Sequence, residues 1–351
     1  MALVGNAPPL SASDGFDPRV YALSPGNVTF LRRLQVWQRL PRERLAPVRA
    51  MRIFGDDARA ELHFDAYDAG VAELAWIAED GELQRALWAG LEAMPYRCEA
   101  LELGAHEAVL TCAEGALAAR LVVGADGANS FVRRAAGIEA AERDYEQAAV
   151  VANFRCEKPH RDVAYQWFQG GPVLALLPLP GDHVSMVWSL PAAEAARIGA
   201  LAPESLTVEV QRASQSLLGA LELASPVRSL ALRRLSARRL VAPRIALVGD
   251  AGHVIHPLAG QGLNLGLQDV RVLAEVLNNR ESGRDAGDYR LLRRYERQRA
   301  EPILAMDTVV SGLFNLYGAR NRFVGGLRNA GLNLTDRLPV LKNVLMRQAM
   351  N

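Results

Sequence analysis

The sequence has few of the residues that mark several common classes of protein. Its three cysteines, Cys98, Cys112 and Cys156, are scattered over 351 residues. This number and spacing do not fit a disulfide-stapled secreted domain and favour reduced thiols in the cytoplasm. Among its six histidines, only His253 and His256 lie close enough to suggest a metal. No cysteine or carboxylate accompanies them at metal-site spacing, so we expect no metal.

Long apolar runs and an excess of one charge are also missing. No apolar stretch reaches the roughly 18 residues that a membrane-spanning helix needs. The opening run MALVGNAPPL has neither the basic start nor the apolar core of a signal peptide. The formal net charge is +1, so no overall field directs the chain toward nucleic acid. We therefore expect a soluble cytoplasmic protein with a large core and no nucleic-acid partner.

The apolar pattern that is present predicts α/β segments on both sides of a β-rich insert. Between 148 and 190, β-branched and aromatic runs separated by turn residues predict an antiparallel sheet. The flanking segments alternate short apolar runs with amphipathic stretches. We expect strands at 2–4, 109–112, 121–123 and 244–248, a hairpin over 51–64, and helices at 25–40, 82–93, 204–218 and 262–277.

The longest motif reads IALVGDAGH from Ile245 to His253 and HPLAGQGLN from His256 to Asn264. It predicts a strand, a polar turn, a glycine-rich loop and the start of a helix. A carboxylate such as Asp250, at the end of a strand, can accept hydrogen bonds from sugar or ribityl hydroxyls. The loop glycines let the backbone approach a flat ligand, and the N–H groups of the helix start favour negative charge. An ordinary βα turn explains Gly249 and Asp250 alone, but not the whole run.

Two shorter motifs precede it. Residues 121–130 read LVVGADGANS, a strand followed by a turn at Asp126 and a helix start, and 17–25 read DPRVYALSP. Alone, the turn is commonplace, and Arg19 in the second run would be taken for a surface arginine. Together with the long motif, they resemble the class A FAD-dependent aromatic monooxygenases, closest to the ubiquinone-biosynthesis hydroxylases with the p-hydroxybenzoate hydroxylase fold.

The resemblance implies a cofactor, a reaction and a set of site residues. NAD(P)H would reduce FAD, and O2 would then be used to hydroxylate a phenolic ring, here a polyprenyl-phenol intermediate of ubiquinone biosynthesis. His256 and Pro257 would lie near the flavin, and no catalytic residue is assigned. The residues expected to bind FAD are Arg19, Asp126, Gly249, Asp250, Pro257, Gly260, Gln261, Gly262, Leu263 and Asn264.

The same resemblance predicts the domains. A Rossmann-like FAD-binding domain would comprise 1–47, 79–147 and 240–307, a β-sheet substrate domain 48–78 and 148–239, and a helical region 308–351. This last region is basic and amphipathic. It is expected either to pack as a lid on the FAD domain or to meet a membrane surface or a quinone-biosynthesis partner. The second alternative would place the protein at the inner face of the membrane.

The sequence departs from the family pattern at three places. It contains no G-x-G-x-x-G run for the pyrophosphate, and Gly5 or Asn6 stands where an acidic residue would hold the ribose. Asp80 and Gly81 replace a usual Asn-Arg pair, and Trp167 a usual arginine. We therefore expect weak FAD binding.

Two origins of these departures stay open: a start placed downstream of the true one, or a degenerate, FAD-poor relative. The second would suit a non-catalytic scaffold subunit of a quinone-biosynthesis complex. Another flavoenzyme of this fold, such as a prenyl-lipid reductase or a halogenase, is a further alternative, although a halogenase W-x-W-x-I-P run is absent from the sequence.

Overall fold

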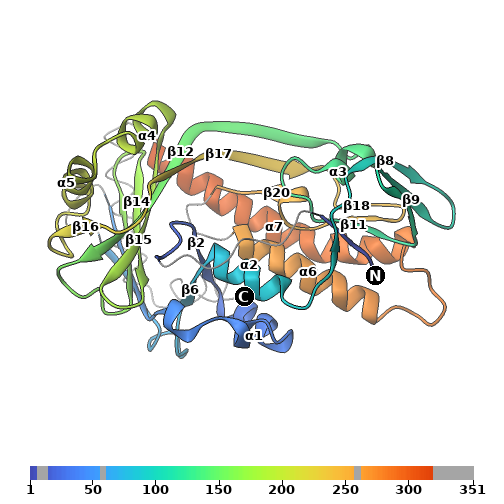
Figure 1. Cartoon of the computed structure of the whole chain (residues 1–351), viewed down its shortest axis with the longest axis horizontal. Helices are drawn as coiled ribbons and strands as arrows, with labels where there is room; N and C mark the ends of the chain where they lie inside the picture. Colours follow the sequence, from blue (N-terminus) through green and yellow to red (C-terminus); the bar gives the residue numbers. More distant parts are fainter. Residues whose placement is uncertain (6–14, 56–60, 257–261, 319–351) are drawn as a thin grey trace. The chain divides into compact units, whose positions relative to one another are not determined.

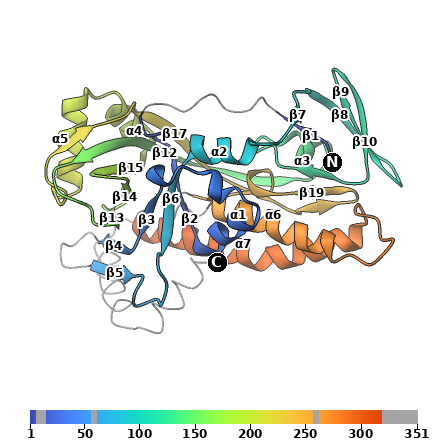
Figure 2. The same ribbon diagram turned by 60° about the horizontal axis from the view of Figure 1, so that its bottom comes forward.

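The chain divides into two compact units, each assembled from segments that are distant in the sequence. The computed structural model describes residues 1–5, 15–55, 61–256 and 262–318 (Figures 1 and 2). Unit 1 comprises Met1–Pro8, Trp88–Tyr145 and Arg233–Ser311, and unit 2 comprises Pro9–Leu87, Glu146–Leu232 and Gly312–Asn351. The assignment of FAD and substrate to particular domains stays a prediction.

Unit 1 contains two parallel strand pairs built from the predicted α/β segments. Strands β1 and β7 pair in parallel, as do β11 and β19, and β18 lies antiparallel to β19. A separate meander has the order β10-β9-β8. The strands are β1 (Leu3–Val4), β7 (Ala93–Met94), β8 (Cys98–Leu103), β9 (Ala108–Cys112), β10 (Gly115–Ala119), β11 (Val122–Gly124), β18 (Val241–Ala242), β19 (Ile245–Leu247) and β20 (His253–Val254).

Both faces of β19 are buried, which explains its unbroken apolar sequence. Ile245 and Leu247 pack on the side of helix α3, and Ala246 packs on the side of helices α6 and α7. These last two helices run side by side (Figures 1 and 2). The helices of unit 1 are α3 (Phe131–Ala135), the single turn η3 (Gly249–Ala251), α6 (Gly262–Asn278) and α7 (Tyr289–Gly318), which crosses the unit boundary near its end.

Unit 2 is built on the predicted antiparallel sheet, with the strand order β12-β15-β14-β13-β4-β5. One pairing, β13 with β4, is parallel and joins strands more than a hundred residues apart. A second sheet has the order β2-β6-β3. The strands are β2 (Val20–Leu23), β3 (Ala46–Val48), β4 (Ala50–Phe54), β5 (Glu61–Asp65), β6 (Ala75–Glu79), β12 (Ala140–Cys156), β13 (Val163–Phe168), β14 (Val173–Leu179), β15 (His183–Pro191), β16 (Leu221–Leu223) and β17 (Arg228–Ala237), with β12 and β17 continuing into unit 1.

The core of unit 2 lies between this sheet and two helices, α4 and α5, that lie beside β14 and β15 (Figure 1). Trp167 belongs to it: the side chain is 2% exposed and stacks on Phe54 at 5.3 Å between ring centroids. The position where the family has an arginine is therefore occupied by a core residue. The helices of unit 2 are α1 (Pro25–Arg33), η1 (Trp37–Arg39), η2 (Arg42–Arg44), α2 (Asp80–Trp88), α4 (Ala192–Gly199) and α5 (Pro203–Ala213).

The mixed α/β fold with an antiparallel insert confirms the predicted fold class, but several helices are shorter than expected. The helix expected over 25–40 ends at Arg33, because Gln35 has the left-handed φ of 58°. Similarly, α2 ends at Trp88 before Gly90 with φ 83°, and α5 ends before Gln215 and Ser216. Helix α6 has nearly the predicted bounds.

The predicted C-terminal helical region begins inside α7, and 319–351 lie outside the described residues. None of the helices in the described ranges is both long and apolar enough to cross a membrane.

Candidate cofactor site

Two of the sequence motifs meet at one edge of a sheet in unit 1. Strands β11 and β19 are parallel neighbours, with Gly124 opposite Leu247, and the Val248 N–H donates to the Gly124 carbonyl at 3.0 Å. The turn containing Asp126 and the turn η3 therefore follow neighbouring strands at their carboxyl ends. In α/β sheets this edge is where ligands bind.

A buried arginine ties these two turns together. Arg133 is 3% exposed; its Nη1 donates to the Ala251 carbonyl and its Nη2 to the Ala128 carbonyl, both at 2.9 Å. The planar guanidinium can reach both turns at once because its donors form a rigid fork. No role of Arg133 could be predicted from the sequence, because nothing in a basic helix start distinguishes it from a surface residue.

Asp126 has a defined local role within its own turn. Its Oδ1 accepts from the Ser130 hydroxyl at 2.5 Å and its Oδ2 accepts from the Val132 N–H at 3.1 Å. The carboxylate thus sits at the N-terminus of α3, where negative charge is favourable. A contact between Asp126 and FAD stays a prediction, with this helix start holding the carboxylate in place.

The turn η3 lies against the beginning of α6. Gly249 has a φ of 58°, which glycine adopts without strain. A β-carbon on Gly266 would stand 3.3 Å from the Gly249 α-carbon, so the two backbones approach closely. Asp250, the next residue, is exposed. The close approach therefore presents the Asp250 side chain at the surface beside the helix start.

A buried network, missed from the sequence, fixes this turn to both long helices. Asp269 in α6 is fully buried, and its Oδ2 accepts from the Gly249 N–H at 2.9 Å and from His253 Nε2 at 2.6 Å. Its Oδ1 accepts from Arg299 Nε at 2.6 Å, and Arg299 itself is 3% exposed. The sequence offered one signal for Asp269, namely a carboxylate placed four residues from both Leu265 and Leu273 on the apolar face of α6. His253 is thus a structural partner in this network.

The start of α6 leaves space beside Gly262 in the part of the chain that the structure describes. Among those residues no atom lies within 4 Å of a β-carbon built on Gly262, and the first turn of α6 contains no acidic residue. The N–H groups of a helix start carry partial positive charge. An exposed carboxylate, a glycine facing open space and a positive helix end together fit the hydroxyl-bearing chain and the anionic ring edge of a flavin.

The remaining predicted residues of unit 1 are partly described. His256 is 1% exposed and meets Tyr145 edge-on at 4.7 Å between ring centroids. Burial lowers the pKa of His256 to about 4, so its imidazole is neutral at physiological pH. Asn264 is buried and Leu263 half-buried at the start of α6. The predicted contacts Pro257, Gly260 and Gln261 lie outside the described residues.

Arg19, the remaining predicted contact, belongs to unit 2. It is exposed, with its guanidinium 3.8 Å from the Asp80 carboxylate and 5.4 Å from the centre of the Tyr21 ring. Asp80 is one of the residues that stand in place of the family's Asn-Arg pair. The pairing gives Arg19 a local partner, and its contact with FAD stays a prediction.

Comparison with known proteins decides the family. A family model described as an FAD binding domain matches residues 105–307, which include both turns and the whole of α6. The 3-demethoxyubiquinol 3-hydroxylase of Escherichia coli is 33% identical over 354 residues, covering 97% of this chain and 89% of that protein. The chain belongs to the FAD-dependent ubiquinone hydroxylase family. The chain is also 32% identical to the ubiquinone hydroxylase UbiL of Rhodospirillum rubrum, over 99% of this chain and 82% of that protein.

The fold of this ubiquinone hydroxylase relative agrees with solved flavoproteins. HpxO of Klebsiella pneumoniae, solved with FAD and uric acid, superposes with a TM-score of 0.73 over 96% of this chain and 89% of that chain, at 18% identity. At that identity the likeness establishes the fold alone. The predicted family and the predicted p-hydroxybenzoate hydroxylase fold are therefore confirmed.

Proposed function

We propose that this chain hydroxylates the aromatic ring of a polyprenyl-phenol intermediate of ubiquinone biosynthesis, using FAD, NAD(P)H and O2. The observation that carries the proposal is the turn Gly249–Ala251, clamped by Asp269 beside the open start of α6. It lies within the segment that matches the FAD-binding family. The names of the relatives, a 3-demethoxyubiquinol 3-hydroxylase and a ubiquinone hydroxylase, support the substrate class.

The residues of the site have separate tasks in this proposal. Asp250 would accept hydrogen bonds from the ribityl hydroxyls of FAD, and the N–H groups at Gly262 and Leu263 would hold the flavin ring. Asp269 and Arg133 act through the turns that they hold. FAD, when bound, supplies the redox chemistry with NAD(P)H and O2. The protein contributes binding, orientation and the exclusion of water.

Replacing Asp250 by alanine tests this placement. A charge-assisted hydrogen bond contributes roughly 1.5–3 kcal/mol, so Asp250→Ala should raise the Kd for FAD at least about tenfold. The measurement is an FAD fluorescence titration of the full chain. Asp68→Ala, which removes another exposed carboxylate in the chain, is the matched control. Equal FAD affinity in the wild type, Asp250→Ala and Asp68→Ala would remove Asp250 from the site.

The reaction is tested with a short-chain polyprenyl phenol, NADH or NADPH, and added FAD. The expected product carries one additional oxygen atom, detected by mass spectrometry, and its formation falls in Asp250→Ala. Expression in an Escherichia coli strain lacking its 3-demethoxyubiquinol 3-hydroxylase gives a second readout, the quinone profile. A chain that takes up no FAD and restores no quinone formation in this strain would contradict the catalytic proposal and favour the scaffold alternative.

A further inference from the structure

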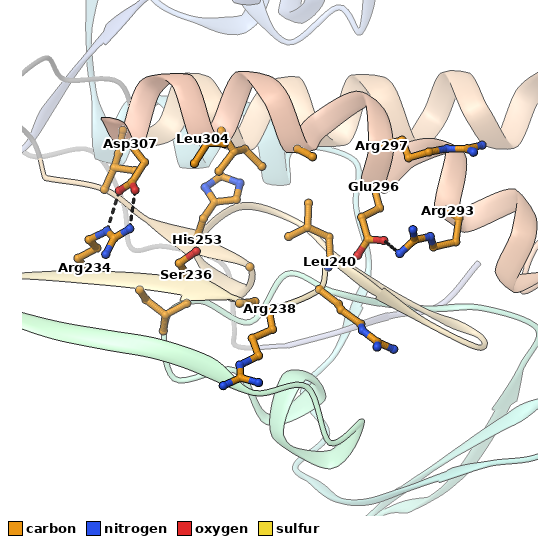
Figure 3. A pocket seen from close by; sticks show the side chains of 17 residues that line it. Arg234, Ser236, Arg238, Leu240, His253, Arg293, Glu296, Arg297, Leu304 and Asp307 are labelled. Carbon is orange, nitrogen blue, oxygen red and sulfur yellow. Dashed lines mark hydrogen bonds and ion pairs between the residues drawn. The ribbon is translucent and has the colours of Figure 1, made fainter. Parts of the chain in front are cut away.

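A cavity of about 420 Å³ in unit 1 is lined by none of the residues predicted to bind FAD. Its walls come from α7, from the end of β17 with the residues leading into β18, and from 252–255 around β20. Figure 3 shows the ion pairs Arg234–Asp307 and Arg293–Glu296 toward opposite ends, with His253 and Leu304 between them. Ligand sites in proteins commonly have volumes of roughly 300–1,000 Å³.

The middle of this cavity is apolar. Leu235, Leu240 and Ile255 are each at least nine-tenths buried beneath it, and Ile303 lies on the α7 side. Leu304, also on α7, is 66% exposed and therefore presents a large apolar side chain to water. Covering such a surface with a hydrocarbon chain is favourable, because apolar area leaves water.

The rim of the cavity is strongly cationic. Five arginines line it against two carboxylates, Glu296 and Asp307, which leaves three positive charges. Those arginines are Arg234, Arg238, Arg239, Arg293 and Arg297.

Two of these arginines are held in place by the two carboxylates. Arg234 Nε donates to Asp307 at 2.7 Å, and Arg293 Nη1 donates to Glu296 at 2.6 Å. The other Glu296 oxygen accepts from the Leu240 N–H at 2.8 Å, which anchors that pair to the cavity wall. A guanidinium has five N–H donors, so both arginines retain donors for an anion.

The other three arginines differ in their partners. Arg238 forms an ion pair with Glu139, which is not a lining residue, at 3.2 Å. Arg239 and Arg297 are exposed, and within the described part of the chain no carboxylate lies in ion-pair range of either. Their charges are therefore available to a ligand.

We propose that this cavity binds an amphipathic anion: a phosphate or carboxylate head held by Arg239 and Arg297, with an apolar chain over Leu240, Ile303 and Leu304. A bare anion would leave the apolar wall uncovered. A nucleotide base would lack a stacking partner, since among the described lining residues only His253 carries an aromatic-type ring, and that ring is buried and engaged with Asp269. The residues assigned to this ligand are not among those proposed to bind FAD.

Binding is measured with dodecyl phosphate below its micelle concentration, by isothermal calorimetry on the full chain without added FAD. We expect one molecule per chain with a Kd of order tens of micromolar. Inorganic phosphate should bind at least about tenfold more weakly. Sedimentation with phosphatidylglycerol–phosphatidylcholine vesicles identifies the source. Vesicle binding that requires Arg239 and Arg297 assigns the site to a membrane lipid, and binding of the monomer alone assigns it to a free amphiphile.

One variant tests the contact with the anionic head of the ligand, and a second tests the contact with its apolar chain. Arg239→Ala combined with Arg297→Ala should weaken dodecyl phosphate binding at least about tenfold, because charge-assisted hydrogen bonds are lost. Leu304→Asp should also weaken it by adding a repelling charge to the apolar wall. All three side chains are exposed, so folding should be preserved, as checked by thermal melting. The controls are Arg290→Ala, an exposed arginine of α7 outside the lining, and Val208→Asp, an exposed apolar residue of α5.

Three results would overturn the proposal. The first is binding of dodecyl phosphate by the double arginine variant with wild-type affinity. The second is inorganic phosphate binding as tightly as dodecyl phosphate, which would make the cavity a simple anion site. The third is an equal loss in the variants and in their controls, which would place the ligand elsewhere on the surface.

Discussion

At the scale of single residues, a substitution at Gly262 distinguishes a role in binding FAD from a role in stabilising the fold. Among the described residues, no other atom lies within 4 Å of a β-carbon built at this position, so Gly262→Val should leave the stability of the apoprotein within about 0.5 kcal/mol. In the holoprotein the same side chain would occupy the space given to the flavin. We expect weaker FAD binding and a more negative reduction potential in the FAD that remains, since the helix start then stabilises the reduced ring less well.

FAD titration, redox titration and apoprotein melting together measure these effects. Gly199→Val is the matched control, because Gly199 also lies at a helix end and none of the described residues has an atom within 4 Å of its added β-carbon. Unchanged affinity and potential in Gly262→Val, or an apoprotein that no longer folds, would mean that the glycine is structural.

The residue types in the sequence indicated the ligand-facing residues of the site better than the buried residues that hold its turns in place. Asp250 and Gly262 stand out in the sequence because carboxylates and glycines in that order suit a flat, hydroxylated ligand. Asp269, Arg299 and Arg133 do not, since each has a partner that lies far away in the sequence, at separations of 20, 30 and 118 residues. Their roles follow from tertiary packing, which a local pattern does not contain.

At the scale of elements, the buried pair Asp269–Arg299 joins α6 to α7. Removing one partner leaves the other charge buried and uncompensated, a loss of roughly 3–5 kcal/mol. We expect Asp269→Asn and Arg299→Gln each to lower the free energy of unfolding by about 3 kcal/mol. The double variant should lose clearly less than the sum, because the two changes affect one interaction.

Urea unfolding of the apoprotein gives the double-mutant cycle. The control cycle uses Glu194 and Arg197, an exposed pair one turn apart on α4, where coupling should be small. Additive losses at Asp269 and Arg299 would show that each side chain acts through other contacts, such as the Gly249 N–H or the Leu265 carbonyl.

Elements with a strong local period were predictable, and their ends and partners were not. The helix expected over 262–277 forms as α6, and the alternating runs at 148–190 form β12 to β15. The helix expected over 25–40 stops early because Gln35 adopts a left-handed φ, which the residue type glutamine does not predict. The parallel pairing of β13 with β4 joins strands that no local pattern relates.

At the scale of the whole molecule, unit 1 depends on segments from the beginning, middle and last third of the chain. Loss of packing around a buried polar group of unit 1 should therefore lower the free energy of unfolding. His256 is such a group, 1% exposed against Tyr145. Its pKa in the folded protein is about 4, lowered by burial from its ordinary value of 6.5.

The sign of the pH effect follows from proton uptake. Above pH 6.5 the imidazole is neutral in both the folded and the unfolded chain, so it contributes no pH dependence. Between pH 6.5 and about 4 the unfolded chain binds a proton that the folded chain does not, so stability falls as the pH falls. The loss from this histidine should be about 2 kcal/mol at pH 5 and about 3 kcal/mol below pH 4.

Urea unfolding of the wild type at pH 7.5 and at pH 5 should therefore show a decrease that His256→Gln largely removes. Glu281 titrates lower, because Arg294 holds its pKa at about 2, so it does not interfere above pH 5. His106→Gln, an exposed histidine of the same unit, should keep the wild-type slope. If His256→Gln and the wild type lose stability in parallel between these two pH values, the imidazole is protonated in the folded protein. Burial against Tyr145 would then not keep the His256 imidazole neutral.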